Sequence, residues 1–150
     1  MNYATALVQI PLVRESTGDY VRTPQNVYDT CIDLATLAQE CFTVLSISTK
    51  NRLINRHMIT LGTVDCALVH PREVFRPIIN DGATACVLVH NHPSGDPAPS
   101  AEDLRITRQL VEAGKILDIK IMDHVIVGRK SAPDSPAWLS LRESGLVVFA

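Results

Sequence analysis

The sequence feature that most constrains the fold is a buried-strand pattern that stops abruptly in a proline-rich loop. Residues 85–90 read Ala-Cys-Val-Leu-Val-His, an almost continuous apolar run of the kind found in strands covered on both faces. Residues 92–99 contain three prolines and a glycine, and they cannot continue the strand because proline donates no ladder hydrogen bond. Ser100–Leu117 then has the apolar spacing of an amphipathic helix. A strand, a loop and a helix are therefore predicted in succession.

Further helices and strands are predicted around this unit. Thr23 and Pro24 have the pattern of an N-cap and a first helical residue, and apolar residues recur at helical spacing up to Gln39. The other predicted elements are strands at 42–48 and 53–61 paired as a hairpin, a helix at 71–79, a strand at 119–127, and short closing segments at 138–141 and 146–149. Because helices and strands alternate, we expect an α/β fold, a layered domain with a central mixed β-sheet and flanking helices.

Composition and charge exclude several classes of protein. The 150 residues are 46% hydrophobic and 20% charged, which predicts one compact domain with a real core. The formal net charge of −2 gives no cationic field of the kind that binding to a nucleic-acid backbone requires. No apolar run is long enough to span a bilayer, and the first residues lack the pattern of a signal peptide. We therefore expect a cytoplasmic protein without a membrane partner.

Four cysteines lie in otherwise apolar segments with no Cys-x-x-Cys pair among them: Cys31, Cys41, Cys66 and Cys86. Zinc-binding and redox-active cysteines usually come in closer pairs. We therefore expect buried free thiols in a reducing compartment.

The residues with a chemical pattern follow the predicted buried strand. His90 and His92 are separated by one residue at its end, and Ser100 and Asp103 follow at the start of the next helix. A loop that folds back would bring Asp103 against the two imidazoles, and zinc accepts neutral nitrogens together with a carboxylate. Three protein ligands leave the fourth tetrahedral position for water, as in catalytic zinc sites. Such a site suits hydrolysis of an amide.

A purely structural interpretation of the same residues is also open. Ser100 and Asp103 could form a capping box at the start of the helix without any metal. His90 could be a hydrogen-bonded core histidine, and His92 a loop residue. Capping and metal binding are compatible, because Ser100 can cap the helix that presents Asp103.

Two longer motifs resemble a known family. Residues 90–103 read H-N-H-P-S-G-D-P-x-P-S-x-x-D and residues 117–128 read L-D-I-x-I-M-D-H-V-I-V-G. Both are similar to RadC proteins, a bacterial branch of the JAB1/MPN (JAMM) metalloprotease superfamily. The resemblance begins at about Thr23, which predicts an N-terminal extension at 1–22 and a RadC-like JAB/MPN domain at 23–150. We expect a short form that lacks the N-terminal helix-hairpin-helix region of full-length RadC proteins.

The resemblance implies a fold and a set of site residues. The superfamily fold is similar to the cytidine deaminase architecture, a mixed sheet between helices. His90, His92 and Asp103 match its zinc ligands, with water as the fourth. Glu40 matches the glutamate that accepts a proton from that water, and Ser100 matches the serine that hydrogen-bonds the tetrahedral oxyanion.

Other titratable residues have competing interpretations. Glu73 and Glu102 are alternatives to Glu40, although Glu73 at a helix start is expected to complement the helix dipole. Asp123 and His124 could orient a zinc ligand, but an internal hydrogen bond without a functional part is the favoured interpretation. The remaining histidines show no partner pattern and are expected to be structural or exposed: His57 and His70.

The resemblance favours a zinc-dependent metallohydrolase, a JAMM-type peptidase or isopeptidase that acts on a peptide or protein substrate with bound Zn²⁺. The alternatives are a non-catalytic JAB/MPN interaction module and a DNA-repair-associated accessory protein; the family label suggests the latter, but the charge argues against nucleic acid.

Eukaryotic JAMM isopeptidases usually carry Ser or Thr where this chain has Asn91, so ubiquitin cleavage is a weak guide to the substrate. A nuclease is disfavoured because HNH nucleases spread their three residues apart. A nucleobase deaminase is excluded by the absence of its H-x-E and P-C-x-x-C motifs.

Overall fold

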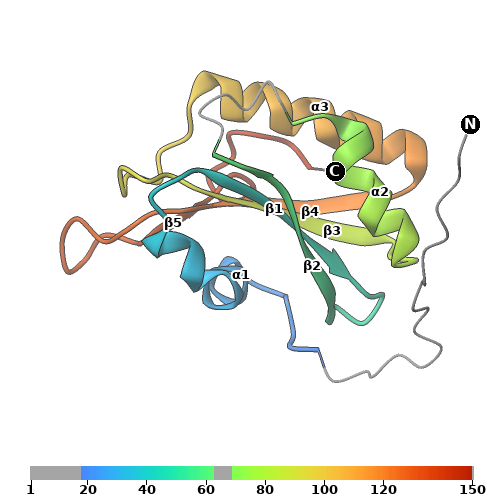
Figure 1. Cartoon of the computed structure of the whole chain (residues 1–150), viewed down its shortest axis with the longest axis horizontal. Coiled ribbons are helices and arrows are strands. Elements are labelled where there is room, and N and C mark those ends of the chain that lie inside the picture. The colour runs from blue at the N-terminus through green and yellow to red at the C-terminus, as the bar shows by residue number, and fades with distance from the viewer. Residues whose placement is uncertain (1–17, 63–68, 150) are drawn as a thin grey trace, which may run out of the picture.

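The computed structural model describes residues 18–62 and 69–149, which form a five-stranded mixed sheet with flanking helices (Figure 1). The strands are β1 (Cys41–Ile47), β2 (Leu53–Leu61), β3 (Ala85–Asn91), β4 (Lys120–Val127) and β5 (Trp138–Ser140). The helices are α1 (Pro24–Thr30), the 3-10 helix η1 (Ile32–Thr36), α2 (Pro71–Asn80) and α3 (Ala101–Leu117). The strand order across the sheet is β2-β1-β3-β4-β5.

The strand pairing explains why the sheet is mixed. β1 pairs antiparallel with β2, as the predicted hairpin requires, and also antiparallel with β3. β3 and β4 are parallel, and α3 is the crossover that parallel neighbours need. β5 returns antiparallel to β4. The α/β fold class predicted from the alternation of elements is confirmed.

Helices cover both faces of the sheet, so the central strands are buried on both sides. α2 and α3 lie over one face and α1 over the other (Figure 1). The first face packs Val44 and Leu88 against apolar residues of α2 and α3. The second packs Leu45 and Val87 against Val27 of α1 and its neighbours. This double burial accounts for the continuous apolar run in β3, where every residue after Ala85 is buried.

The predicted helix from Pro24 to Gln39 is wrong in length, because the α-helix ends at Thr30 and the chain continues as η1. The Thr30 hydroxyl donates a hydrogen bond to the backbone oxygen of Asn26, a local bond of the kind that bends helices. Two β-branched residues so close together, Thr30 and Ile32, also disfavour a continuing helix. The apolar spacing that suggested the longer helix reflects burial of Cys31 and Leu34 against the sheet.

The two closing segments behave differently. The first contains β5. The second, 146–149, has no regular structure, although Val147 and Phe149 are buried in the core between the sheet, α2 and α3. Val147 and Phe149 therefore complete a core without extending the sheet.

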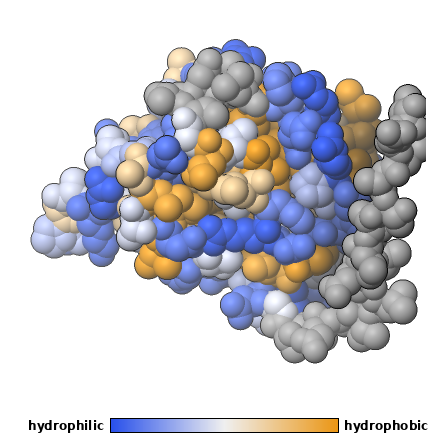
Figure 2. Space-filling model, in the orientation of Figure 1, coloured by the Kyte–Doolittle hydropathy of each residue, from blue (hydrophilic) through white to orange (hydrophobic). Residues whose placement is uncertain are grey.

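β2 lies at one edge of the sheet and carries exposed apolar side chains. Met58 is 63% exposed and Leu61 50% exposed. Figure 2 shows hydrophobic side chains in the middle of the face that contains this strand. Among the described residues, no helix has the length and apolar character needed to cross a membrane.

The cysteines of the described chain are free and buried, as predicted: Cys31, Cys41 and Cys86. Burial raises the pKa of the Cys31 thiol to about 11 and that of the Cys86 thiol to about 12. These two thiols are therefore protonated and poorly nucleophilic in the folded protein. Cys66 lies outside the described residues.

A pair of substitutions on α3 tests which face of this helix stabilises the fold. Leu110 is fully buried in the core, whereas Ile116 is 87% exposed. Leu110→Ala should lower the free energy of unfolding by about 2–5 kcal/mol, because it removes buried methyl groups and leaves a cavity. The control Ile116→Ala should change it by no more than about 0.5 kcal/mol. Urea denaturation measures both; equal losses in the two variants would contradict this packing.

Candidate metal centre

The candidate centre forms where β3 runs into the proline-rich loop. His90 lies near the end of β3 and His92 just beyond it, so both project to the face covered by α3. The backbone nitrogen of His92 still donates to the oxygen of Val127, which keeps this segment beside β4. The chain then turns at Gly95, whose φ of +89° lies in the left-handed region. The loop thus returns toward the sheet, and α3 begins at Ala101.

Close backbone packing holds this loop in place. The oxygen of Gly95 accepts a hydrogen bond from the nitrogen of Arg129 at 2.7 Å. A Cβ at Gly128 would lie 2.3 Å from that oxygen, so only glycine fits there. The Arg129 guanidinium also donates to the oxygen of Pro93. These contacts fix the loop that links the two histidines to α3.

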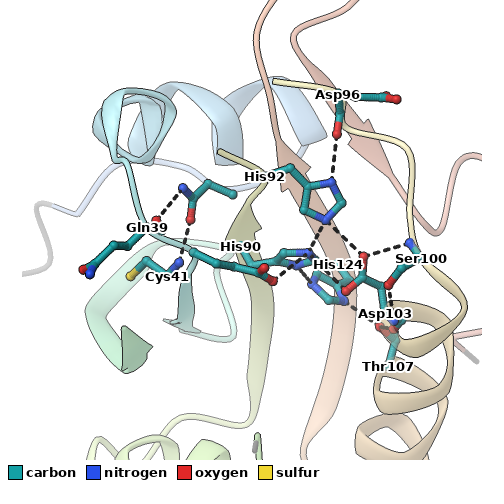
Figure 3. A network of polar contacts seen from close by, with 11 residues as sticks. Gln39, Cys41, His90, His92, Asp96, Ser100, Asp103, Thr107 and His124 are labelled. Atoms are coloured by element: carbon teal, nitrogen blue, oxygen red, sulfur yellow. Dashed lines mark hydrogen bonds and ion pairs between the residues drawn. The ribbon is translucent and has the colours of Figure 1, made fainter. Parts of the chain in front are cut away.

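Four side chains converge in this region, as Figure 3 shows for three of them. The Nε2 atoms of His90 and His92 are 3.0 Å apart. The Asp103 carboxylate lies 3.4 Å from the first of these atoms and 3.1 Å from the second. Glu40, which directly precedes β1, places Oε1 3.8 Å from His90 Nε2. One ligand atom from each residue falls within 4.8 Å of all the others, so this group could hold a metal ion.

Ser100 and Asp103 also form the capping box that the structural interpretation predicted. The Ser100 hydroxyl accepts a hydrogen bond from the nitrogen of Asp103, and the Ser100 nitrogen donates to Asp103 Oδ2 at 2.9 Å. The cap fixes the orientation of the buried carboxylate that faces the histidines. Capping and convergence on the histidines therefore occur together, and one does not exclude the other.

A buried chain of hydrogen bonds sets the tautomer of His90 (Figure 3). Thr107 Oγ1 donates its one hydrogen to the backbone oxygen of Asp103, so it must accept from His124 Nδ1, 2.6 Å away. Burial, reinforced by the neighbouring His90, lowers the pKa of His124 well below its usual value, so this ring is neutral. Its Nε2 therefore accepts a hydrogen bond from His90 Nδ1 at 2.7 Å. His90 is left with a lone pair on Nε2, the atom that faces the centre.

The tautomer of His92 follows from a single contact. Its Nδ1 lies 2.8 Å from the backbone oxygen of Asp96, which can only accept, so Nδ1 carries the hydrogen. Neutral His92 therefore also presents a lone pair on Nε2. Two lone pairs and a carboxylate then face one another in a largely buried space, an arrangement that is stable only with a cation among them.

The pKa shifts of His92 and Asp103 also favour a positive charge in the centre. Burial lowers the pKa of His92, but hydrogen bonds to Asp103 and Asp96, the first of which needs a proton on Nε2, outweigh this effect and raise the pKa overall. Burial would raise the pKa of Asp103, yet His90 and His92 beside the carboxylate favour its charged form and bring its pKa far below the usual value. Asp103 is therefore ionised. A proton on His92 or a bound metal cation can balance this charge.

The competing acidic residues lie elsewhere. Glu73 pairs with Arg76 on α2, and Glu102 pairs with Arg105 on α3. Asp123 accepts hydrogen bonds from the Ser140 hydroxyl and the backbone nitrogen of residue 142, an internal role as favoured from the sequence.

Of the other histidines, His57 is structural, with Nε2 2.6 Å from Asp81 Oδ2. His70 is half-buried at the N-cap position of α2. His124 makes an internal hydrogen bond directly to His90, the contact that its alternative interpretation, orientation of a zinc ligand, requires. The sequence gave no reason to select its partner Thr107, which is apparent only when α3 packs on β4.

The α/β architecture with two histidines and two carboxylates at one strand end defines a candidate metal-binding domain. The chain belongs to the RadC-like JAB domain family, whose model matches residues 21–146. This match confirms the resemblance to RadC proteins seen in the sequence.

Relatives with known sequences agree with this assignment. The chain is 42% identical over 130 residues to a UPF0758 protein of Caldanaerobacter subterraneus subsp. tengcongensis, covering 86% of this chain and 53% of the relative. It is 41% identical over 138 residues to a UPF0758 protein of Listeria monocytogenes, covering 91% of this chain and 59% of the relative. The chain thus spans somewhat more than half the length of these curated relatives.

The chain of hydrogen bonds behind His90 can be tested by one substitution with a matched control. Thr107→Val removes the acceptor for His124 Nδ1 and frees the tautomer of His90. We expect the dissociation constant for added Zn²⁺ to rise about 10–100-fold. Thr43→Val, at a buried threonine whose hydroxyl contacts only Cys41 among the described residues, should leave it unchanged. Calorimetric titration measures both, and equal affinities for Thr107→Val and the wild type would contradict the account.

Proposed function

We propose that this chain is a zinc-dependent metallohydrolase, a JAMM-type peptidase or isopeptidase that cleaves an amide bond in a peptide or protein. The observation that carries the proposal is the convergence of two imidazole Nε2 atoms, 3.0 Å apart, on the buried Asp103 carboxylate, with the Glu40 carboxylate within 4 Å. Membership of the RadC-like JAB domain family supports it.

The ligand set favours zinc. A tetrahedral zinc ion with bonds of about 2.0–2.1 Å places its ligand atoms roughly 3.3 Å apart. The Nε2 atoms of His90 and His92 are 3.0 Å apart, and Asp103 places Oδ1 3.4 Å from the first and Oδ2 3.1 Å from the second. Two neutral nitrogens and one carboxylate also match the softness that zinc prefers, and three protein ligands leave one position open. Zinc held there would supply Lewis-acid chemistry, polarising the substrate carbonyl and lowering the pKa of water.

Glu40 and Ser100 would act on the reacting atoms beside these ligands. The Glu40 side chain is 18% exposed, so its carboxylate is at the boundary between the buried ligands and solvent, where it can accept a proton from the attacking water. The Ser100 oxygen already accepts from the Asp103 nitrogen, which leaves its own hydrogen to donate. That hydrogen can stabilise the oxyanion that forms as the carbonyl is attacked.

The two alternative functions make different demands on the same residues. A non-catalytic interaction module needs neither the ligands nor Glu40, whereas this chain has brought all four together. A DNA-repair accessory role would need a surface for nucleic acid, and the net charge of −2 does not favour one. The cytoplasm, expected from the sequence, fits all three functions.

Variants of the proposed base and ligands separate these functions. In zinc-loaded protein, Glu40→Gln should lower kcat on a peptide panel by about 10²–10⁴-fold while the zinc content stays the same, because Gln cannot accept the proton. His92→Ala and Asp103→Ala should lose both zinc and turnover. The control Glu73→Gln, on the exposed start of α2, should lose neither.

Mass spectrometry of the peptides and metal analysis of the protein give the two readouts. Full activity in Glu40→Gln would contradict the assigned role of this residue. Zinc-loaded wild-type protein that cleaves no peptide would favour the interaction module.

A further inference from the structure

Asn91 separates the two candidate ligands and lies on the opposite face of β3. Because side chains alternate along a strand, His90 and His92 face α3 while Asn91 faces the side covered by α1 and η1. Asn91 is 1% exposed. Its side chain makes two hydrogen bonds, accepting from the Cys41 nitrogen at 2.7 Å and donating to the Gln39 oxygen at 3.0 Å.

These two backbone groups flank Glu40. The residue pairing between β1 and β3 ends at Phe42 and His90, so the chain before Phe42 has no ladder partner from β3. The Asn91 amide replaces that ladder, with one bond on each side of Glu40. On the other side, the Glu40 oxygen accepts a hydrogen bond from the nitrogen of Gly62. The backbone of Glu40 is therefore held from both neighbouring segments.

The chemistry of this contact specifies asparagine. The contact uses an acceptor and a donor on two separate atoms, which the asparagine amide supplies; a Ser or Thr hydroxyl offers both on one atom, and ionised Asp has no donor. The Cys41 nitrogen belongs to a buried residue, where loss of its acceptor is costly, whereas Gln39 is exposed. A side chain without an acceptor would leave the Cys41 nitrogen unsatisfied.

We propose that Asn91 is a positioning residue, which holds the backbone around Glu40 so that its carboxylate faces the ligands His90 and His92. The proposal rests on the proposed role of Glu40 as the proton acceptor. The segment His90-Asn91-His92 then has two functions: its outer residues supply metal ligands, and its middle residue fixes the distance from these ligands to the base. This links the placement of the base to that of the metal without any direct contact between Asn91 and the reacting atoms.

Hydrogen exchange tests the contact itself and needs neither metal nor substrate. In Asn91→Ala, the amide of Cys41 should exchange at least about 10-fold faster than in the wild-type chain, because it loses its acceptor. Asn91→Ser guards against loss of folding, since its hydroxyl can pair with one of the two groups. Ser46→Ala, which removes the hydrogen bond from a buried serine to Asp81 at the far end of β1, is the control and should leave exchange at Cys41 unchanged. Unchanged exchange in Asn91→Ala would overturn the proposal.

A double-mutant comparison tests whether Asn91 acts through Glu40. With a peptide that the zinc-loaded wild-type protein cleaves, Asn91→Ala should lower kcat at least about 10-fold with KM and zinc content unchanged, since small displacements of a catalytic group are costly. In the Glu40→Gln background the same substitution should have no further effect on kcat. An equal fractional loss in both backgrounds would show a general structural role and overturn the proposal. If Glu40→Gln alone left kcat unchanged, the proposed role of Glu40 would fail, whereas the exchange result would still decide whether Asn91 holds this segment.

Discussion

Two imidazole nitrogens lie 3.0 Å apart beside a buried, ionised carboxylate, and the centre depends on this electrostatic arrangement. In a site of low dielectric constant such a cluster costs free energy unless a cation lies within it. The hydrogen bonds on the far side of each ring fix the lone pairs in place. His124 accepts from His90, and the backbone oxygen of Asp96 accepts from His92. Neither ring can turn its Nδ1–H toward the centre without losing its hydrogen bond, which is buried for His90 and exposed for His92.

The fold supplies these constraints from elements that are far apart in the sequence. The two histidines lie at and just after the end of β3, and Asp103 lies in the capped first turn of α3. Glu40 directly precedes β1. Thr107, one turn after Asp103 on α3, completes the connection to β4 through His124. The elements that pack to form the core are therefore the ones that position the site, so core stability and site geometry are coupled.

The sequence predicted those parts of the structure that depend on local patterns. The apolar run of β3, the prolines after it and the Ser100–Asp103 spacing are local signals, and the strand, loop and capped helix follow from them. The same signals brought His90, His92 and Asp103 forward as candidates, and the structure places their side chains together. Glu40 was selected only through family resemblance, because nothing in its local spacing connects it to residues fifty positions away.

Features that depend on particular side-chain hydrogen bonds or on packing between distant elements were not predictable. The end of α1 at Thr30 depends on a side-chain hydrogen bond that competes with the helix, and apolar spacing carries no trace of it. The bond between His124 and His90 requires the register of β3 beside β4. The hydrogen bonds from Asn91 to the backbone on either side of Glu40 depend on where the pairing of β1 and β3 ends.

Anomalous scattering tests the central claim most directly. For crystals of the protein loaded with zinc, diffraction data collected on the two sides of the zinc absorption edge should show one strong peak, about 2.0–2.1 Å from Nε2 of both His90 and His92 and about 2.0–2.2 Å from an Asp103 oxygen. No peak at this position, or a peak bound only by other residues, would contradict the account. It would leave a proton on His92 as the cation that balances the cluster.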